Sequence, residues 1–117
     1  MEFTSTMKTN KLRVIKDFDK VDTEIQEQIK LVFPNGFSQH LIEYTDKEGK
    51  LVFALPFETD EKIYMIRMSV KKAIQIIKDD DDYDDDGILK DDIKEKYEDE
   101  HSDVEYLSDN ENYDEDY

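Results

Sequence analysis

The chain has no cysteine and only two prolines and three glycines among its 117 residues. Without cysteine, disulfides, thiolate metal sites and cysteine nucleophiles are excluded. The glycines lie singly in turn-like segments, so no glycine-rich phosphate-binding loop is present. No apolar run approaches the ~18 residues of a membrane span. The first residues also lack the basic and apolar segments of a secretory signal, and we expect a cytoplasmic protein.

Negative charge is abundant and unevenly distributed. Residues 1–78 hold 13 Lys and Arg against 12 Asp and Glu, a net charge of +1. Residues 79–117 hold 3 Lys against 20 Asp and Glu, a net charge of −17, which gives −16 for the chain. Such a block is usually solvated and often meets a basic partner, and it argues against direct binding to anionic lipid or nucleic acid. We therefore expect a flexible N-terminus (1–10), a small domain (11–78) and an acidic tail (79–117).

The central segment predicts a small α+β domain in the order β-α-β-β-β-α. We expect an antiparallel sheet of three to four strands with two short helices, followed by a partly helical or disordered tail. The first helix should stop at Pro34-Asn35-Gly36, and Pro56 indicates an edge strand or a bulge. The predicted strands cover residues 12–18, 37–44, 51–57 and 63–68, and the helices begin at Asp22 or Thr23 and at Ser69.

The acidic tail divides into three stretches. Residues 79–87 are almost pure carboxylate and should be extended by self-repulsion. Residues 88–107 carry apolar side chains at helical spacing and predict an amphipathic helix, and residues 108–117 resemble a disordered end. An extended tail would carry one net charge per ~7–8 Å, whereas a helical one would carry one per ~3.4 Å. The second value matches the phosphate spacing of single-stranded DNA, about 3.4 Å, so nucleic-acid mimicry requires a helical or folded-back tail.

Five of the seven tyrosines lie in this tail, and a purely solubilising segment has no need of aromatic rings. The leading hypothesis is a non-enzymatic regulatory protein whose tail occupies a basic surface of a nucleic-acid-binding or nucleic-acid-processing partner. Carboxylates would stand in for phosphates, and Tyr83, Tyr97 and Tyr106 would anchor the partner. The predicted partner-binding residues are Asp79, Asp80, Asp81, Asp82, Tyr83, Asp84, Asp85, Asp86, Asp91, Asp92, Tyr97, Glu98, Asp99, Glu100 and Tyr106. Some scattered basic residues could instead hold the tail in cis: Arg13, Lys16, Lys71, Lys72 and Lys78.

The segment Asp82–Gly87 fits the Asp-x-Asp-x-Asp-Gly start of a calcium loop. Alternating carboxylates bring oxygens onto one hard cation, and the glycine permits the sharp turn. The ligands would be Asp82, Asp84 and Asp86, but the twelfth position, which should be a bidentate Glu, is Ile93. A calcium-binding module is therefore one alternative function. A small binding domain with a purely solubilising tail is another, and no other cofactor is expected.

Catalysis has little support in the sequence. His40 and His101 are the only histidines, and neither has a second His or a Cys with which to form a metal centre. Ser38 and His40 alone do not make a catalytic triad. A run of carboxylates does not by itself define an acid–base pair, so we do not expect an enzyme.

Overall fold

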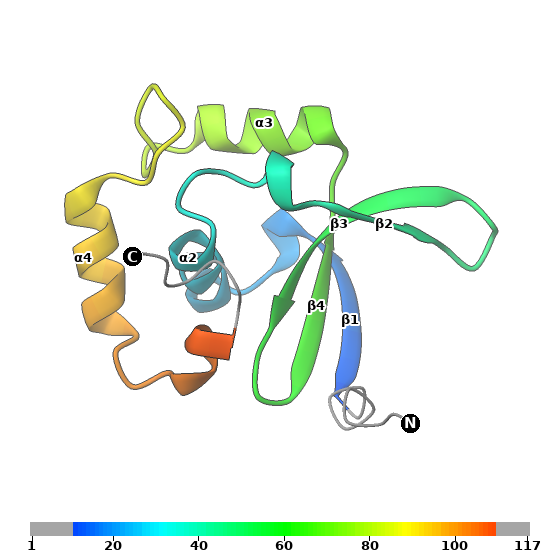
Figure 1. Ribbon diagram of the computed structural model, residues 1–117, viewed down its shortest axis with the longest axis horizontal. Coiled ribbons are helices and arrows are strands. Elements are labelled where there is room, and N and C mark those ends of the chain that lie inside the picture. The colour runs from blue at the N-terminus through cyan, green and yellow to red at the C-terminus, as the bar shows by residue number, and fades with distance from the viewer. Residues whose placement is uncertain (1–10, 110–117) are drawn as a thin grey trace.

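The computed structural model describes residues 11–109 as a four-stranded mixed sheet with helices at one end (Figure 1). The strand order is β1-β4-β3-β2. This arrangement confirms the α+β prediction. The strands are β1 (Leu12–Asp17), β2 (Ile42–Thr45), β3 (Leu51–Glu58) and β4 (Lys62–Arg67), the α-helices are α2 (Thr23–Val32), α3 (Val70–Asp79) and α4 (Asp91–Glu100), and the 3₁₀ helices are η1 (Phe18–Lys20), η2 (Ser38–His40) and η3 (Glu105–Asp109).

One strand pair corrects the expectation of a wholly antiparallel sheet. β1 runs parallel to β4, with Val14 opposite Tyr64, whereas β2–β3 and β3–β4 are antiparallel. The first strand thus pairs with the last, and the long connection between them includes α2 and the β2–β3 hairpin. Short alternating patterns identify strands but carry no information about the direction of such a distant pairing.

The two helices predicted in the central domain are present at the expected places. Asp22 precedes α2, which ends at Val32 and is followed by its C-cap Phe33 and then Pro34. In α3 the Ser69 Oγ accepts a hydrogen bond from the Lys72 backbone N–H at 3.0 Å, so Ser69 is the predicted N-cap. Their apolar residues recur three or four positions apart, which places them on the face that packs against the rest of the fold.

The segment predicted as a strand over 37–44 is strand only at its end. It begins with the short η2 helix, and β2 starts at Ile42. Phe37 is 1% exposed and its ring centroid lies 5.5 Å from that of Phe18, so burial of this ring turns the chain inward. Pro56 lies beyond Ala54, the last β3 residue paired on that side with β2. The strand is therefore locally an edge there, where the missing N–H removes no ladder bond.

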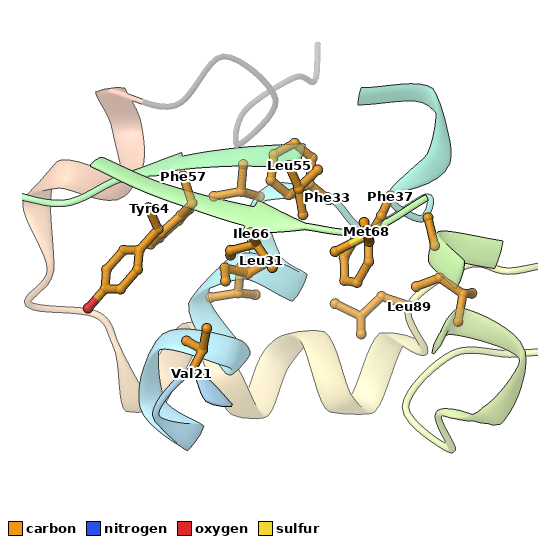
Figure 2. Packing of buried hydrophobic residues seen from close by; sticks show 14 of the residues in the cluster. Val21, Leu31, Phe33, Phe37, Leu55, Phe57, Tyr64, Ile66, Met68 and Leu89 are labelled. Carbon is orange, nitrogen blue, oxygen red and sulfur yellow. The ribbon is translucent and has the colours of Figure 1, made fainter. Parts of the chain in front are cut away.

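The hydrophobic core lies between one sheet face and the helices. Figure 2 shows Leu31 of α2 beneath Ile66 of β4, with Leu55 and Phe57 of β3 beside them. The acidic third of the chain contributes to the same core through four buried residues, Tyr83, Leu89, Tyr97 and Leu107. The hydrophobic core therefore extends past residue 78, where the composition of the chain changes. The expectations for residues 1–10 and 110–117 fall outside the described residues.

Within residues 11–109, no helix combines the length and apolar character that crossing a bilayer would demand.

Candidate functional site: a folded acidic surface

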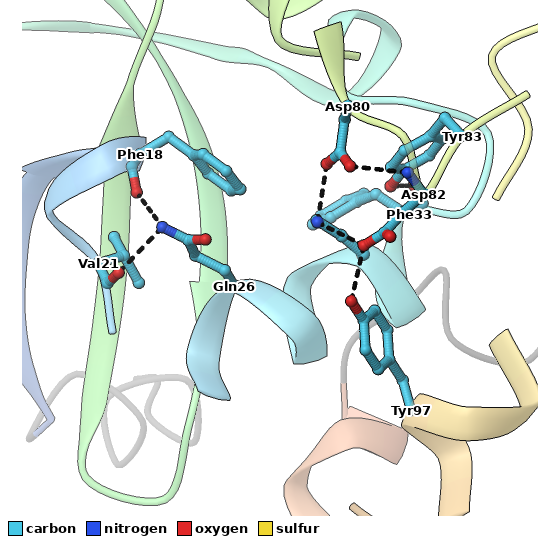
Figure 3. Close-up of polar contacts among 9 residues, drawn as sticks. Phe18, Val21, Gln26, Phe33, Asp80, Asp82, Tyr83 and Tyr97 are labelled. Carbon is cyan, nitrogen blue, oxygen red and sulfur yellow. Dashed lines mark hydrogen bonds and ion pairs between the residues drawn. The ribbon is translucent and has the colours of Figure 1, made fainter. Parts of the chain in front are cut away.

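The acidic segment is attached to the domain through a buried lysine of α2. Lys30 Nζ lies 2.7 Å from Asp80 Oδ2 and 2.8 Å from Asp82 Oδ2. The Tyr97 hydroxyl donates to the same Asp82 oxygen at 2.6 Å. Figure 3 shows Asp80 and Tyr97 approaching Asp82 from opposite sides. The cation that holds the segment in cis is thus Lys30, which is not among the basic residues that the sequence suggested.

The contacts within this cluster shift the pKa values of Lys30, Asp82 and Tyr97. Burial alone would lower the pKa of Lys30, but its hydrogen bonds to Asp80 and Asp82 outweigh burial and raise that pKa. Burial alone would likewise raise the pKa of Asp82, and hydrogen bonds from Lys30 and Tyr97 outweigh it and lower that pKa. Burial and the Asp82 carboxylate together raise the pKa of Tyr97 well above its ordinary range. The cluster therefore holds a charged Lys30, a charged Asp82 and a neutral Tyr97 over a wide range of pH.

The three tyrosines predicted to anchor a partner make hydrogen bonds within their own chain, and their role in binding a partner stays a prediction. The buried Tyr83 donates its hydroxyl hydrogen to the Phe33 carbonyl oxygen at 3.0 Å. The hydroxyl of Tyr106 donates to Gln28 Oε1 at 2.5 Å. Tyr97 is 8% exposed and is bonded to Asp82. These rings supply apolar area to the core of their own chain, so they are not available to another protein in this conformation.

The aspartate run is folded, which corrects the expectation of an extended segment. Asp84 Oδ1 accepts hydrogen bonds from the backbone N–H groups of Asp86 and Ile88, at 2.8 and 3.0 Å. Gly87 takes a φ of 78°, which a residue with a side chain rarely adopts. The Leu89 N–H then bonds to the Pro34 carbonyl oxygen at 2.8 Å. These bonds close a compact turn on the domain and outweigh the repulsion of its carboxylates.

Two of the three proposed calcium ligands, Asp82 and Asp84, have other partners in this turn. Asp82 is bonded to Lys30 and Tyr97, and an oxygen of Asp84 accepts two backbone N–H groups. The cation next to Asp82 is the lysine ammonium of the same chain. The turn therefore has a structural explanation that needs no calcium, and the calcium module stays a sequence prediction.

Almost all remaining carboxylates of the segment are exposed to solvent. Between residues 79 and 105 only Asp80 and Asp82 are partly covered, and the other thirteen acidic residues are exposed. Within α4, six carboxylates and two lysines give a net charge of −4 over a helix of about 15 Å, or one charge per ~4 Å. The exposed acidic residues are Asp79, Asp81, Asp84, Asp85, Asp86, Asp91, Asp92, Glu95, Glu98, Asp99, Glu100, Asp103 and Glu105.

We call this set of thirteen residues the acidic surface. Figure 1 places α4 and the turn before it at one end of the molecule, far from the β2–β3 hairpin at the other. The helix in this segment is shorter than the one predicted over 88–107, since α4 spans only Asp91–Glu100 and η3 follows separately. Ten of these thirteen carboxylates are among the predicted partner-binding residues, and the structure places them on one folded segment.

A groove of about 950 Å³ borders the acidic surface between α3 and the aspartate turn. Its lining combines Ile74 and Ile77 of α3 with the carboxylates of Asp84 and Asp85. Ile74 is 45% exposed, so apolar area remains accessible there. An acidic rim beside apolar carbon suits the aliphatic stem and charged end of a lysine or arginine side chain.

A second polar contact fixes the far end of α4. His101 Nε2 lies 2.9 Å from Glu27 Oε1 of α2, and His101 is 8% exposed. Sequence reasoning missed both this contact and Lys30. One signal was available for Lys30, because it lies between Ile29 and Leu31 in the apolar C-terminal turn of an amphipathic helix. For Glu27 and His101, 74 positions apart, the sequence offers no such signal.

Comparison with known proteins adds no relative: no protein-family model, no curated protein and no solved structure matches this chain.

Proposed function

We propose that this protein is a non-enzymatic, cytoplasmic regulator whose acidic surface binds a basic surface of a nucleic-acid-binding partner and competes there with nucleic acid. The observation that carries the proposal is the exposure of thirteen carboxylates on a folded scaffold. Their spacing along α4, about 4 Å per net charge, is close to the ~3.4 Å of a single DNA strand. A preorganised array also binds without the ordering entropy that a disordered tail would lose.

The distribution of charge within α4 supports a role beyond folding. Asp91, Glu95 and Asp99 follow one another at intervals of four residues, so like charges neighbour each other along one face. Asp99 also lies in the last turn, where a negative charge opposes the helix dipole. Both features destabilise a helix by a few tenths of a kcal/mol each. A helix whose only role was to cover the core would need neither the like charges four residues apart nor the negative charge in its last turn.

The groove beside α3 offers the partner a place for an anchoring side chain. The predicted tyrosine anchors are engaged inside the molecule, so affinity has to come from elsewhere. A lysine or arginine of the partner could place its aliphatic stem against Ile74 and its charge near Asp84. The expected recognition thus combines long-range attraction with a small apolar contact, which gives fast and strongly salt-dependent association.

The test keeps the fold and changes only the charge. Partners captured with the intact chain at about 50 mM salt are identified, purified and titrated with the protein in the presence and absence of short DNA. The variant Glu95→Gln/Glu98→Gln/Asp99→Asn removes three exposed charges from α4. We expect its affinity to fall by about tenfold or more, which corresponds to roughly 0.5 kcal/mol per charge. The DNA should displace the wild-type protein from its partner.

The matched control removes the same number of charges elsewhere. The variant Glu43→Gln/Glu48→Gln/Glu61→Gln alters exposed carboxylates of β2 and of two turns, and its affinity should stay within about twofold. Equal weakening by both variants would mean that only net charge matters and would contradict a specific surface. A Glu95/Glu98/Asp99 variant that keeps its partner but precipitates would favour the solubilising role instead.

A further inference from the structure

Three metal-ligating side chains converge where the C-terminal end of α4 meets α2. The ligand atoms of Glu27, Glu100 and His101 all lie within 4.8 Å of one another. His101 is nearly buried and directs Nε2 at Glu27 Oε1, 2.9 Å away. Glu27 is partly buried, whereas Glu100 is exposed. The three side chains thus form a cluster of ligands that runs from the buried His101 to the exposed Glu100.

Backbone geometry explains how two consecutive residues reach the same point. On a continuous helix, neighbouring side chains point about 100° apart because there are 3.6 residues per turn. His101 has left the helix, with φ −113° and ψ 26°, and its N–H bonds back to the Tyr97 carbonyl oxygen. This departure from helical geometry turns the imidazole inward, toward Glu27 of α2, while Glu100 remains exposed.

From this convergence we infer that Glu27, Glu100 and His101 form a binding site for a divalent first-row transition metal such as Zn²⁺. Imidazole nitrogen and carboxylate oxygen are both ligands of Zn²⁺, and three protein ligands with water in the fourth position are the usual arrangement of an open zinc site. Mg²⁺ and Ca²⁺ prefer oxygen ligands alone, so the imidazole selects against them. The inference does not depend on the proposed partner.

Only small movements are needed to close the site. Ligand atoms around tetrahedral Zn²⁺ are about 3.4 Å apart, given bond lengths near 2.1 Å, so no pair has to approach by more than about 1.4 Å. The exposed Glu100 side chain can supply this movement. The metal would replace the hydrogen bond between His101 and Glu27, and the Nε2 proton, where present, would leave to solvent. The acidic surface near the site attracts cations to it.

A metal at this position would hold α4 against α2. It would thereby fix the end of the acidic surface opposite the Lys30 cluster, so that the helix is secured at both ends. The expected consequence is tighter presentation of the acidic surface in the metal-bound protein. The alternative is diffuse binding of cations to the many exposed carboxylates, and the experiment has to separate the two.

The first test uses the two histidines of the wild-type chain. The metal-free full chain is titrated with ZnCl₂ while the imidazole nitrogens are followed by ¹⁵N NMR. We expect the His101 Nε2 resonance to shift and saturate at one equivalent, with His40 unchanged. Equal responses of both histidines, or no response at His101, would overturn the inference. This readout requires no variant and so does not depend on whether a variant folds.

The second test compares two exposed glutamates of the same helix. Glu100→Gln should weaken Zn²⁺ binding, measured by calorimetry, by tenfold or more. Glu98→Gln removes the same charge without touching the site, and its affinity should change by less than about threefold. Glu27→Gln should behave like Glu100→Gln. Comparable losses in all three variants, or displacement of Zn²⁺ by equimolar Ca²⁺ or Mg²⁺, would show diffuse binding and contradict the site.

Discussion

At the scale of single residues, Lys30 links the acidic segment to the rest of the chain. Its side chain is 10% exposed and is surrounded by two carboxylates that are 17% and 20% exposed. An ion pair in such a place stabilises little compared with apolar side chains, but the loss of one member leaves uncompensated charge in a poorly solvated site. Lys30 should therefore matter far more than the other cations of the domain.

The variant Lys30→Met tests this view. We expect the free energy of unfolding at neutral pH, measured by urea titration, to fall by about 3 kcal/mol, since Asp80 and Asp82 then repel each other in a half-buried site. Arg67→Met is the matched control, because the Arg67–Asp17 pair is more than half exposed, and it should cost less than about 1 kcal/mol. Similar effects in the two variants would mean that the Lys30 cluster is no more than a surface ion pair.

The hydroxyls of Tyr83 and Tyr97 predict a loss of stability in alkali. Burial, joined by nearby aspartates, raises the pKa of both groups above the ordinary 10.0. In the unfolded chain they lose their protons near pH 10, while the folded state retains them, so the unfolded state binds fewer protons above that pH. Stability is then full below pH 10 and falls as pH rises above it, by about 1.4 kcal/mol per pH unit for each group.

The measurement is the free energy of unfolding between pH 9 and pH 12, compared with Tyr97→Phe. The variant should start lower at pH 9, by about 1.5–3 kcal/mol, because it lacks the hydrogen bond to a charged acceptor. Its stability should also fall with a shallower slope above pH 10, because one titrating group is gone. Parallel curves for the two proteins would show that Tyr97 does not titrate differently in the folded state.

At the scale of elements, the turn before α4 is part of the core, although its composition suggests a detached tail. Leu89 is 2% exposed, whereas its neighbour Ile88 is 41% exposed. Leu89→Ala should lower the free energy of unfolding by about 2–5 kcal/mol, since it leaves a cavity against the domain. Ile88→Ala should cost less than about 1 kcal/mol. Equal small effects would indicate that the acidic segment does not pack on the domain.

Because the acidic segment packs on the domain, deleting it cannot test partner binding separately from folding. A chain ending at residue 78 lacks the four apolar residues that the acidic third contributes to the core and exposes their partners on α2 and the sheet. We expect such a truncated protein to be aggregation-prone or unfolded, as judged by circular dichroism, and loss of a partner would then follow from loss of the fold. Charge substitutions on α4 are therefore the appropriate test of function.

The elements of the first 78 residues could be predicted because their signals are local. The apolar spacing of α2, the Ser69 cap and the turn at Gly49 each involve residues a few positions apart. The parallel pairing of β1 with β4 depends on contacts about fifty residues apart, and no short pattern encodes it. The apolar spacing of residues 89–107 was visible in the sequence, but it gives only one face of a helix. It does not say whether that face meets the same chain or a partner.

The candidate site was predictable in part for the same reason. Exposed carboxylates follow from composition, since an unpaired acidic side chain is rarely buried. The burial of Tyr83 and Tyr97 in their own fold could not be predicted, because an aromatic ring in an acidic segment can be buried either in its own chain or in a complex. Lys30 decides between these outcomes, because a buried cation on α2 needs Asp80 and Asp82, which come just before Tyr83.

At the scale of the whole molecule, the uneven distribution of charge predicts how stability depends on salt. The acidic surface concentrates repulsion at one end of the fold, and simple salt screens it. The Lys30 cluster is partly buried and should be screened much less. Raising NaCl from about 10 mM to about 150 mM shortens the Debye length from ~30 Å to ~8 Å, and the thermal unfolding midpoint should then rise by about 5 °C.

The Glu95→Gln/Glu98→Gln/Asp99→Asn variant shows whether this repulsion comes from α4. Its unfolding midpoint at 10 mM NaCl should exceed that of the wild type, and its further rise with salt should be smaller, since three of the repelling charges are gone. The control variant with Glu43, Glu48 and Glu61 changed to Gln should retain the full salt response. A midpoint that falls with salt in the wild type would mean that attractive ion pairs outweigh the repulsion, and the acidic surface would then be electrostatically satisfied within its own chain.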